Sequence, residues 1–467
     1  MTLIDAQAIP SFASLGRVHF IAIGGAGMSG VASAFLARGL TVSGSDQVDS
    51  ETLQALTRQG AQIWIGHDAA HLTGVDTVVI SSAIRETNVE LAEARRLGLP
   101  VLHRSVALAC LMEDRRVISV AGTHGKTTTT AMAVSAFLGA GADPSYVLGG
   151  TFLESGLGAH LGTTDQFIVE ADESDGSFRQ YPTTIAVVTT LEADHLDNWG
   201  TPELYAQGFE QFASSPTVSL VIVDGDDPGA RFLGQSLAAA GRQVITYGEG
   251  DDCDLRLSQV NMTGLSSLAR LSWGEWSATL RLQVPGNHNL HNAAAAFAVG
   301  AALGLDRAGL LEGLAQFRGT ARRFQRLGCT RGVLVVDDYA HHPTEVAATI
   351  KAARIVADAG RVIACFQPHL YTRTRDFATE FAQALAAADE VVVLDVYPAR
   401  EDPIAGVSGE LIVDALKSFT GSVHYVPRLE DAPAALEPLA GPGDLVLTLG
   451  AGSVTAVGPL LLRLLEE

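Results

Sequence analysis

The stretch RVISVAGTHGKTTTT, residues 116–130, decides the fold expected for this chain. Residues 117–121 form a short apolar run, which predicts a buried strand of a parallel sheet. A glycine-rich turn follows, then Lys126 and Thr127, and residues 128–138 have a helical pattern. In such a phosphate-binding loop, backbone amides donate to an anion, the lysine supplies charge and the threonine hydroxyl reaches Mg²⁺. The predicted ATP-phosphate contacts are Gly122, Thr123, His124, Gly125, Lys126, Thr127 and Thr128.

The loop is shorter than the usual phosphate loop. Val120 stands where an earlier glycine is expected, so the pattern begins at Gly122 and reads G-x-x-G-K-T. The alternative interpretation is an ordinary glycine turn between a strand and a helix. The lysine–threonine pair at the helix start favours the phosphate loop, because an anion would bind there. Lys126 is also the sole lysine among residues 1–350.

Composition limits the classes of function. At 467 residues the chain is too long for one core, and its hydrophobic content of 47% suits a folded protein of several domains. The net charge of −21 argues against sequence-independent nucleic-acid binding, which needs clustered cations. Four widely spaced cysteines indicate reduced thiols, and no signal peptide or membrane-spanning run is evident. We therefore expect a cytoplasmic protein with neither nucleic-acid nor membrane partners.

Two acidic clusters follow predicted strands in the same region. The strand at residues 166–169 leads into Glu170–Asp175, and the strand at 185–189 leads into Glu192–Asp197. Carboxylates at the carboxyl ends of parallel strands, beside a phosphate loop, are suited to Mg²⁺. Taken alone, either cluster could instead be a group of solvent-exposed charges on a loop. Two such clusters beside one phosphate loop favour a Mg·ATP site.

A second glycine turn lies near the N-terminus. A predicted strand at residues 18–23 leads into GGAGMSG, residues 24–30, and then a helix to about residue 38. Gly25, Gly27 and Gly30 fit the dinucleotide-binding pattern, with Asp46 about twenty residues later. Alone, this pattern suggests NAD; the broader inference is a nucleotide diphosphate with Asp46 near a ribose. Ser81 and Ser82 end a predicted strand at 77–80 and would either cap a helix or contact ligand.

Later segments complete an α/β pattern. Asn289 and Asn292 lie one turn apart in a predicted helix, where they would either cap it or bind an adenine edge. Beyond a linker at residues 319–324, polar residues again follow predicted strands, at 333–336, 362–366, 391–394 and 445–449. We expect three domains: an N-terminal Rossmann-like parallel sheet (1–113), a central P-loop ATPase-like mixed sheet (114–320) and a C-terminal Rossmann-like α/β domain (321–467).

The order of these motifs resembles the Mur ligases. The segments are GGAGMSG, SSAI, AGTHGKTTTT, EADESD, EADHLD, GNHNLHNA, RRF, DDYAHHPTE, QPHLYTRT and GAGS, which cover about residues 18–453. The resemblance implies an ADP-forming ligase of peptidoglycan precursor synthesis that uses ATP and Mg²⁺. The lactyl carboxylate of UDP-N-acetylmuramate would be activated as an acyl phosphate and joined to the amine of L-alanine. The expected assembly is a monomer or weak homodimer.

The resemblance also implies roles for residues. Lys126, Glu173, His195 and Arg373 would be catalytic, and Thr127, Glu173 and His195 would hold Mg²⁺. Further ATP contacts would be Asn289, Asn292, Arg323 and Asp338. Tyr339, His341 and His342 would lie on the amino-acid side. The UDP-sugar site, in place of an NAD site, would comprise Gly25, Ala26, Gly27, Met28, Ser29, Gly30, Asp46, His67, Ser81, Ser82, Ala83 and Arg85.

Two features distinguish this chain within that resemblance. Leu370 stands where the family usually has arginine, which removes one cation expected near the substrate carboxylate. No lysine lies between Lys126 and Lys351, so the carbamylated lysine of later Mur ligases is missing. This second feature is similar to the alanine-adding branch.

Other functions are open to test. Within the family, the alternative is a recycling ligase that joins the same sugar nucleotide to a preformed tripeptide. From another class, the first glycine turn would suit a nicotinamide-dependent oxidoreductase, although no hydride-transfer acid–base pair is evident nearby. A non-catalytic nucleotide-binding regulator is a third possibility, for which the acidic clusters would be superfluous.

Overall fold

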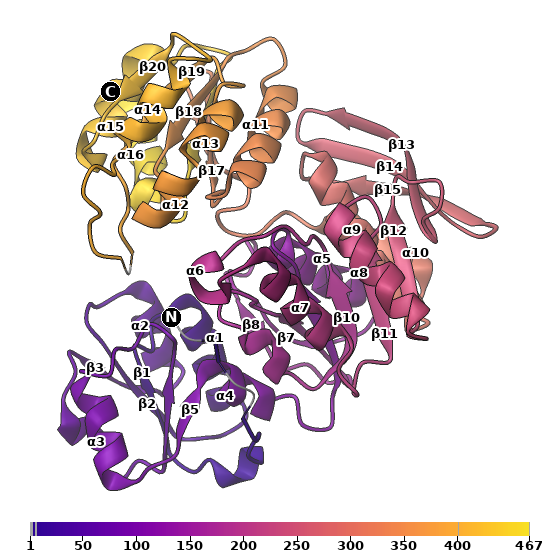
Figure 1. Cartoon of the computed structure of the whole chain (residues 1–467), viewed down its shortest axis with the longest axis vertical. Helices are drawn as coiled ribbons and strands as arrows, with labels where there is room; N and C mark the ends of the chain where they lie inside the picture. The colour runs from indigo at the N-terminus through magenta and orange to yellow at the C-terminus, as the bar shows by residue number, and fades with distance from the viewer. Residues whose placement is uncertain (1–2, 5–6, 400, 467) are drawn as a thin grey trace. The chain divides into compact units, whose positions relative to one another are not determined.

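The computed structural model describes residues 3–4, 7–399 and 401–466, whose strands form three sheets (Figure 1). The chain forms two compact units. The first holds the described residues up to Ser258 with Arg270–Leu280 and His291–Gln316, and the second holds Gln259–Ala269, Arg281–Leu290 and the described residues from Phe317 on. Among the described residues, no helix is both long enough and apolar enough to cross a bilayer.

The first sheet is parallel and has the order β3-β2-β1-β4-β5. Alternate residues of β1 enter different cores, because successive side chains of a strand point to opposite faces. Val18 and Phe20 share a core with residues of α1 and α2, whereas Ile21 packs with Leu91 of α3. The elements are η1 (Phe12–Ser14), β1 (Val18–Ile21), α1 (Ala26–Ala37), β2 (Val42–Asp46), α2 (Glu51–Arg58), β3 (Gln62–Ile65), η2 (Ala69–Leu72), β4 (Thr77–Ile80), α3 (Val89–Leu97), β5 (Val101–His103) and α4 (Arg104–Cys110).

The second sheet places the phosphate loop between the two acidic clusters. Its order is β15-β14-β13-β12-β11-β10-β6-β9-β7-β8, and β6 pairs in parallel with both β9 and β10. The segments that follow these three strands therefore emerge at one edge, as predicted. The strands are β6 (Arg116–Ala121), β7 (Ser145–Val147), β8 (Ala159–His160), β9 (Gln166–Glu170), β10 (Thr183–Val188), β11 (Leu220–Asp224), β12 (Val244–Gly248), β13 (Leu255–Thr263), β14 (Ser266–Trp273) and β15 (Trp276–Leu282).

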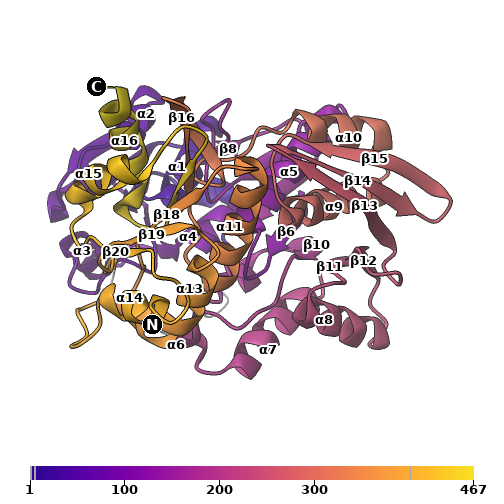
Figure 2. The ribbon, with the colours of Figure 1, turned by 90° about the horizontal axis from the view of Figure 1, so that it is seen from above.

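Helices cover this sheet. α5 packs on β6 and β9, and α7 and α8 contribute to the core that contains Val117 and Ala121 of β6. The strands β13, β14 and β15 succeed one another at one end of the sheet (Figure 2). The helices are α5 (Lys126–Gly139), η3 (Ser177–Gln180), α6 (Leu196–Trp199), α7 (Pro202–Ala213), α8 (Pro228–Ala239), α9 (Asn287–Ala302) and α10 (Arg307–Gln316).

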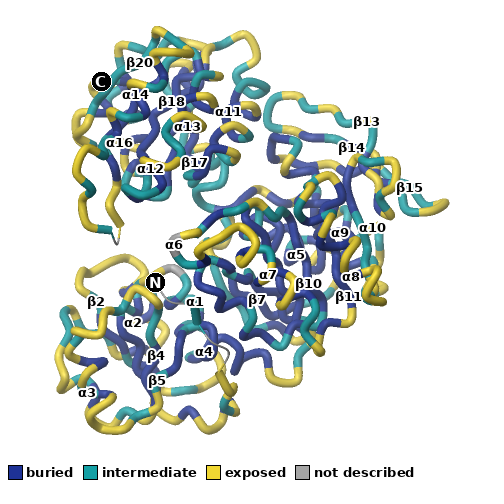
Figure 3. The backbone as a smooth tube through the Cα atoms, in the orientation of Figure 1, coloured by how far each residue is buried: buried dark blue, intermediate teal, exposed yellow. Residues whose placement is uncertain are grey.

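The third sheet has the order β16-β17-β21-β18-β19-β20 and a core on each face. Val336 packs with residues of α11, α13 and α14, whereas Val335 packs with residues of α15 and α16. The central strands β17, β18 and β21 are buried along most of their length (Figure 3). The elements are β16 (Gln325–Thr330), β17 (Val333–Asp338), α11 (Pro343–Ala357), β18 (Val362–Phe366), α12 (Tyr371–Asp376), α13 (Ala378–Leu385), β19 (Glu390–Val393), α14 (Glu410–Leu416), β20 (Val423–Tyr425), η4 (Leu429–Asp431), α15 (Ala432–Leu436), η5 (Glu437–Leu439), β21 (Leu445–Leu449), η6 (Ser453–Ala456) and α16 (Val457–Glu466).

Several strands were not expected from the sequence. They are β5, β7, β8, β14, β16 and β20. β16 reads QRLGCT, in which polar residues and a glycine interrupt the apolar pattern. It forms because its backbone pairs antiparallel with β17 at the edge of the sheet. Edge pairing of this kind leaves a weak signal in side-chain composition.

The close packing of α5 on α10 generates the first prediction. A Cβ on Gly139 would lie 2.4 Å from the backbone nitrogen of Gly313 and 2.5 Å from the carbonyl oxygen of Gly309. Gly139→Ala should therefore destabilise the protein by about 1–3 kcal/mol, because the two helix backbones would have to separate. Thermal unfolding should show a lower midpoint.

Gly421→Ala is the control, because a Cβ at that position would have no other atom within 4 Å and the φ of Gly421 is not in the left-handed region. Its unfolding midpoint should match that of the wild type. Equal midpoints for Gly139→Ala and the wild type would contradict the packing argument.

Candidate active site

The phosphate loop is shaped by two glycines that have positive φ angles. Gly122 has a φ of 138°, and a Cβ there would lie 2.1 Å from Oγ1 of Thr189. Gly125 has a φ of 80°, and a Cβ there would lie 2.6 Å from Oδ1 of Asn292. The backbone amide of His124 donates to Oγ1 of Thr190 at 2.9 Å. Glycine is required at both positions because the loop approaches its neighbours so closely.

Lys126 is the first residue of α5, and its ammonium group is held inside the loop. Nζ donates to the carbonyl oxygens of Gly122 and Thr123, at 2.5 and 3.1 Å, and to Oε1 of Glu173 at 2.9 Å. Burial opposes the charged form, but the carboxylate of Glu173 outweighs it and raises the pKa of Lys126. The loop therefore contains a fixed positive charge where the sequence predicts phosphate.

Glu173 is fully buried and has one unsatisfied oxygen. Its Oε2 has no hydrogen-bond partner among the described residues. Burial raises the pKa of Glu173 to about 8; Lys126 opposes this shift and the carboxylate of Asp172 adds to it. A buried carboxylate oxygen without a partner is unfavourable unless a ligand satisfies it. Glu173 therefore fits the predicted role of an oxygen ligand for a divalent cation.

His195 and Asp194 come from the second acidic cluster and reach the same place. His195 Nε2 lies 3.9 Å from Oε1 of Glu173 and 3.6 Å from Oδ2 of Asp194. Thr127 lies in the first turn of α5, and its side chain is buried. The structure thus brings Lys126, Glu173 and His195 together, as expected from the strand order.

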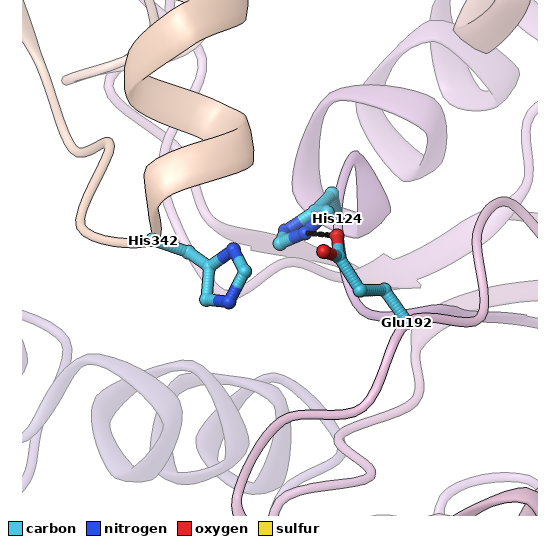
Figure 4. A group of neighbouring side chains, drawn as sticks. All are labelled: His124, Glu192 and His342. Carbon is cyan, nitrogen blue, oxygen red and sulfur yellow. Dashed lines mark hydrogen bonds and ion pairs between the residues drawn. The ribbon is translucent and has the colours of Figure 1, made fainter. Parts of the chain in front are cut away.

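His124 extends the loop toward the second cluster. Its Nε2 lies 3.1 Å from Oε2 of Glu192, which follows β10 (Figure 4). Thr123 makes two further contacts there: its hydroxyl donates to the carbonyl oxygen of Glu192 at 2.7 Å and lies 3.0 Å from the hydroxyl of Tyr205. These contacts join the phosphate loop to the segment after β10.

The predicted asparagines take part in different contacts. Nδ2 of Asn289, in the first turn of α9, donates to the carbonyl oxygen of Pro285 at 2.7 Å, just before the helix. Oδ1 of Asn292 accepts a hydrogen bond from Oγ1 of Thr129 at 3.0 Å. Asn292 therefore lies beside the phosphate loop. The adenine-binding role of both residues stays a prediction.

The N-terminal glycine turn is braced by Asp46. Its Oδ2 accepts from the amide of Gly24 at 2.9 Å, and its Oδ1 accepts from the amide of Gln47 at 2.8 Å. The side chain of Met28 packs in the core, so only its backbone can face a ligand. Ser29 and Gly30 follow in the first turns of α1, whereas the side chain of Ala26 lies outside the described residues.

The other predicted sugar-nucleotide residues follow β3 and β4, strands of the same parallel sheet. His67 Nδ1 lies 3.0 Å from Oε2 of the buried Glu90. Despite burial, hydrogen bonds from His19, Ser45 and His71 lower the pKa of Glu90 to about 2. The loop after β4 carries Ser81, Ser82, Ala83 and Arg85, of which the last three are exposed.

Sequence reasoning missed a partly buried arginine, Arg104, that links the N-terminal glycine turn to the first acidic cluster. Arg104 begins α4, and its Nη2 lies 3.4 Å from Oδ2 of Asp172. Its Nη1 packs so closely on Gly27 that a Cβ there would lie 2.1 Å away. Its position directly after the strand at 101–103 was the available signal. The carboxyl ends of β1, β4 and β5 meet at one edge of the first sheet, where the glycine turn also lies. Ser82 is also linked to the acidic cluster, since its Oγ donates to Oδ2 of Asp175 at 2.6 Å.

The third sheet has its own polar edge. Asp338, at the end of β17, accepts hydrogen bonds from the amides of Phe324 and Ala340, at 2.7 and 2.8 Å. Burial raises the pKa of Asp338 to about 6, although Arg323 opposes the shift. The guanidinium of Arg323 also lies 5.2 Å from the ring centroid of Tyr339.

The remaining predicted residues of this edge lie nearby in the same unit. His341 Nδ1 lies 3.2 Å from Oε2 of Glu345, and the ring of His342 lies 5.2 Å from that of Phe377. Arg373 is buried in α12. Leu370, directly before α12, is also buried and has a φ of 71°, which is unusual for leucine. The sequence alone gave no sign of this backbone conformation.

Three family models match consecutive segments of the chain. They are described as the Mur ligase family catalytic domain (residues 17–116), the Mur ligase middle domain (120–300) and the Mur ligase glutamate ligase domain (322–452). A relative from Cutibacterium acnes named UDP-N-acetylmuramate–L-alanine ligase is 56% identical, and the alignment covers 100% of this chain and 99% of the relative.

Two crystal structures are also similar. A UDP-N-acetylmuramate–alanine ligase from Thermotoga maritima has a TM-score of 0.83 at 29% identity, covering 96% of this chain and 99% of that chain. A murein peptide ligase from Psychrobacter arcticus has a TM-score of 0.73 at 25% identity, covering 96% of this chain and 98% of that chain.

The buried carboxyl of Glu173 generates a pH-dependent prediction. Its folded-state pKa of about 8 exceeds its ordinary value of 4.5, so the folded state retains a proton that the unfolded state loses. Its contribution to stability is therefore present below about pH 4.5 and is lost as the pH rises toward 8. Glu173→Gln avoids this loss. In EDTA and without nucleotide, the unfolding midpoint of the variant minus that of the wild type should therefore become more positive by about 2–8 °C between pH 5.5 and pH 8, whatever the loss of the Lys126 contact costs at both pH values.

Glu210→Gln is the matched control, because Glu210 is an exposed residue of α7 and no ion pair of it is found among the described residues. Its midpoint should differ from that of the wild type by a similar amount at both pH values. A gap between Glu173→Gln and the wild type that does not change with pH would contradict the raised pKa.

Proposed function

Because this chain belongs to the Mur ligase family, we propose that it joins L-alanine to the lactyl carboxylate of UDP-N-acetylmuramate at the expense of ATP. The observation that carries this proposal is the ion pair between Lys126 of the phosphate loop and Glu173 of the first acidic cluster. It provides a fixed cation beside an unsatisfied carboxylate oxygen, which suits the transfer of a phosphoryl group. The full-length similarity to a ligase named for these two substrates supports the choice of substrates.

The first chemical step activates the carboxylate. A lactyl carboxylate oxygen attacks the γ-phosphorus of ATP, the bond to the β,γ-bridging oxygen breaks, and ADP leaves with the electron pair. Lys126 stabilises the negative charge that spreads over the transferred group, and the amides after Gly122 orient the phosphates. Further ATP contacts are assigned to Asn289, Asn292, Arg323 and Asp338.

Mg²⁺ would be held by Glu173, His195 and Thr127. The orphaned Oε2 of Glu173 fits this role, because it is a hard oxygen ligand with no partner among the described residues. When bound, the ion would neutralise phosphate charge. Its positive charge would also favour the ionised form of Glu173, which burial otherwise disfavours.

The second step forms the amide bond. The amine of L-alanine attacks the carbonyl carbon of the acyl phosphate, a tetrahedral intermediate forms, and inorganic phosphate leaves as the amine loses its proton. Arg373, Tyr339, His341 and His342 are assigned to the amino-acid side. The sugar nucleotide is assigned to the turn from Gly25 to Gly30 with Asp46, His67 and the loop Ser81–Arg85. We also propose a cytoplasmic location and a monomer or weak homodimer.

The alternative function is ligation of a preformed tripeptide to the same sugar nucleotide. The similarity to a murein peptide ligase structure favours it as the second candidate. The nicotinamide-dependent oxidoreductase is not favoured, because the three family models and the full-length relative are all described as ligases.

The proposed function is tested by phosphate release in the presence of ATP, Mg²⁺ and UDP-N-acetylmuramate. Release should depend on L-alanine, and mass spectrometry should show the amide product. Glycine, L-serine and the tripeptide are the comparison acceptors. Ligation of the tripeptide without ligation of L-alanine would exclude the proposed function in favour of the recycling reaction.

Lys126→Ala should reduce phosphate release by at least about 10²–10³-fold, because the transferred phosphoryl group loses its positive partner. Binding of UDP-N-acetylmuramate, measured by calorimetry, should persist. Lys351→Ala is a matched control that removes an exposed lysine of α11 and should retain the wild-type rate. Turnover in Lys126→Ala equal to that of the control would refute the role of Lys126.

A further inference from the structure

A second group of potential metal ligands lies two strands away from the phosphate loop. Asp224 is the last residue of β11, Asp226 follows it, and Glu249 directly follows β12. β11 and β12 are parallel neighbours, so both segments lie at one edge of the sheet. His291 reaches them from α9, and one ligand atom each from Asp224, Asp226 and His291 lie within 4.8 Å of one another.

The imidazole of His291 is oriented by one carboxylate and faces two others. Its Nδ1 lies 2.7 Å from Oδ2 of Asp224, a hydrogen-bond distance that fixes the N–H at Nδ1 in the neutral ring. Its Nε2 then presents a lone pair, 3.7 Å from Oδ2 of Asp226 and 3.5 Å from Oε1 of Glu249. A carboxylate on one ring nitrogen and a metal on the other is the usual arrangement of a metal-bound histidine.

The spacing suits a metal ion. Ligands at about 2.0–2.1 Å from a tetrahedral ion lie about 3.3 Å apart, close to the 3.7 and 3.5 Å that separate Nε2 from the oxygens of Asp226 and Glu249. The half-exposed Glu249 side chain would turn to bring its oxygen closer to that of Asp226. Asp226 is already positioned, because its Oδ1 accepts from the amide of Gly250 at 3.0 Å. The mixture of an imidazole nitrogen with two carboxylate oxygens distinguishes this group from an exposed acidic patch.

The local charge also favours a cation. Three carboxylates surround one histidine, whereas the nearby Arg231 and Arg256 form ion pairs with Asp252 and Asp251. Cys253 lies beside the cluster, but burial raises the pKa of its thiol to about 11, with a further contribution from Asp226. The available donors at neutral pH are therefore nitrogen and oxygen.

We propose that His291 Nε2, Asp226 and Glu249 bind a divalent transition-metal ion of the Zn²⁺ type, with Asp224 orienting the imidazole. The ion links the ends of β11 and β12 to α9. Asn292, the next residue of α9, accepts a hydrogen bond from Thr129 of α5, so the same ion also braces the helix that contacts the phosphate-loop helix. This site does not depend on the proposed ligase activity.

The test is a Co²⁺ titration of the full-length, EDTA-treated protein, followed by visible absorption and by competition with Zn²⁺. The wild type should bind one more equivalent than His291→Asn, with the more intense bands of a low-coordinate Co²⁺ ion. Glu249→Gln should bind at least about tenfold more weakly. The Glu249 side chain is 46% exposed, so this variant tests the site even if His291→Asn does not fold.

Two controls separate this site from other metal binding. His160→Asn removes a histidine that lies 2.8 Å from Asp143, another histidine–carboxylate pair, and should behave as the wild type. Glu173→Gln removes the ligand proposed for Mg²⁺ and should keep the Co²⁺ equivalent that depends on His291. Failure of the ligase assay would leave these results unaffected.

The pH dependence gives an independent measurement. Burial opposes protonation of His291, but Asp224 and the other carboxylates outweigh it and raise its pKa. Co²⁺ must displace that proton, so its affinity should fall as the pH is lowered, and more steeply in the wild type than in His291→Asn. Equal Co²⁺ stoichiometry and affinity in the wild type, His291→Asn and Glu249→Gln would overturn the proposal and leave an ion-pair cluster only.

Discussion

The buried pair of Lys126 and Glu173 is the constraint on which the rest of the site depends. Nζ and Oε1 lie 2.9 Å apart in surroundings from which water is largely excluded. A lone charge would be very unfavourable there, so each group needs the other, and Lys126 also needs the carbonyl oxygens of the loop. The pair is balanced only in part, because Oε2 of Glu173 has no partner among the described residues. That incomplete balance is what makes the site ready for a cation and phosphate.

The sheet and its helices hold this pair in position. β6 lies between β9 and β10, so Lys126, Glu173 and His195 arrive from three adjacent strand ends without a long loop between them. α5 starts at Lys126 and packs along α10 through glycine contacts, which allow two helix backbones to approach closely. The side chain of Asn292, in α9, packs closely against Gly125 of the phosphate loop. The small residues thus allow the helices and the phosphate loop to pack closely around the Lys126–Glu173 pair.

Sequence patterns predicted much of this arrangement because strand ends in parallel sheets meet at one edge. The phosphate loop, both acidic clusters and the strand runs at 77–80 and 362–366 follow from local periodicity and glycine placement. The edge strand β16 was missed because its backbone pairing leaves little trace in its polar sequence. Arg104 and His291 were missed for another reason: their partners, Asp172 and Asp224, lie 68 and 67 residues away, and a contact over that separation exists only after folding.

The net charge of the chain explains why the few cations near the proposed sites are important for binding anionic ligands. The chain carries a net charge of −21, yet the ligands proposed for it are a triphosphate and a sugar nucleotide, which are also anions. Long-range attraction cannot hold such ligands, so short-range contacts with a few desolvated cations must do so. Lys126 and Arg104 are the partly buried cations of the proposed sites, and each lies beside a carboxylate that raises its pKa. In the proposed site the acidic clusters would therefore have two effects: they would supply ligands for a metal ion, and they would keep charged the cations with which a negatively charged protein binds phosphate.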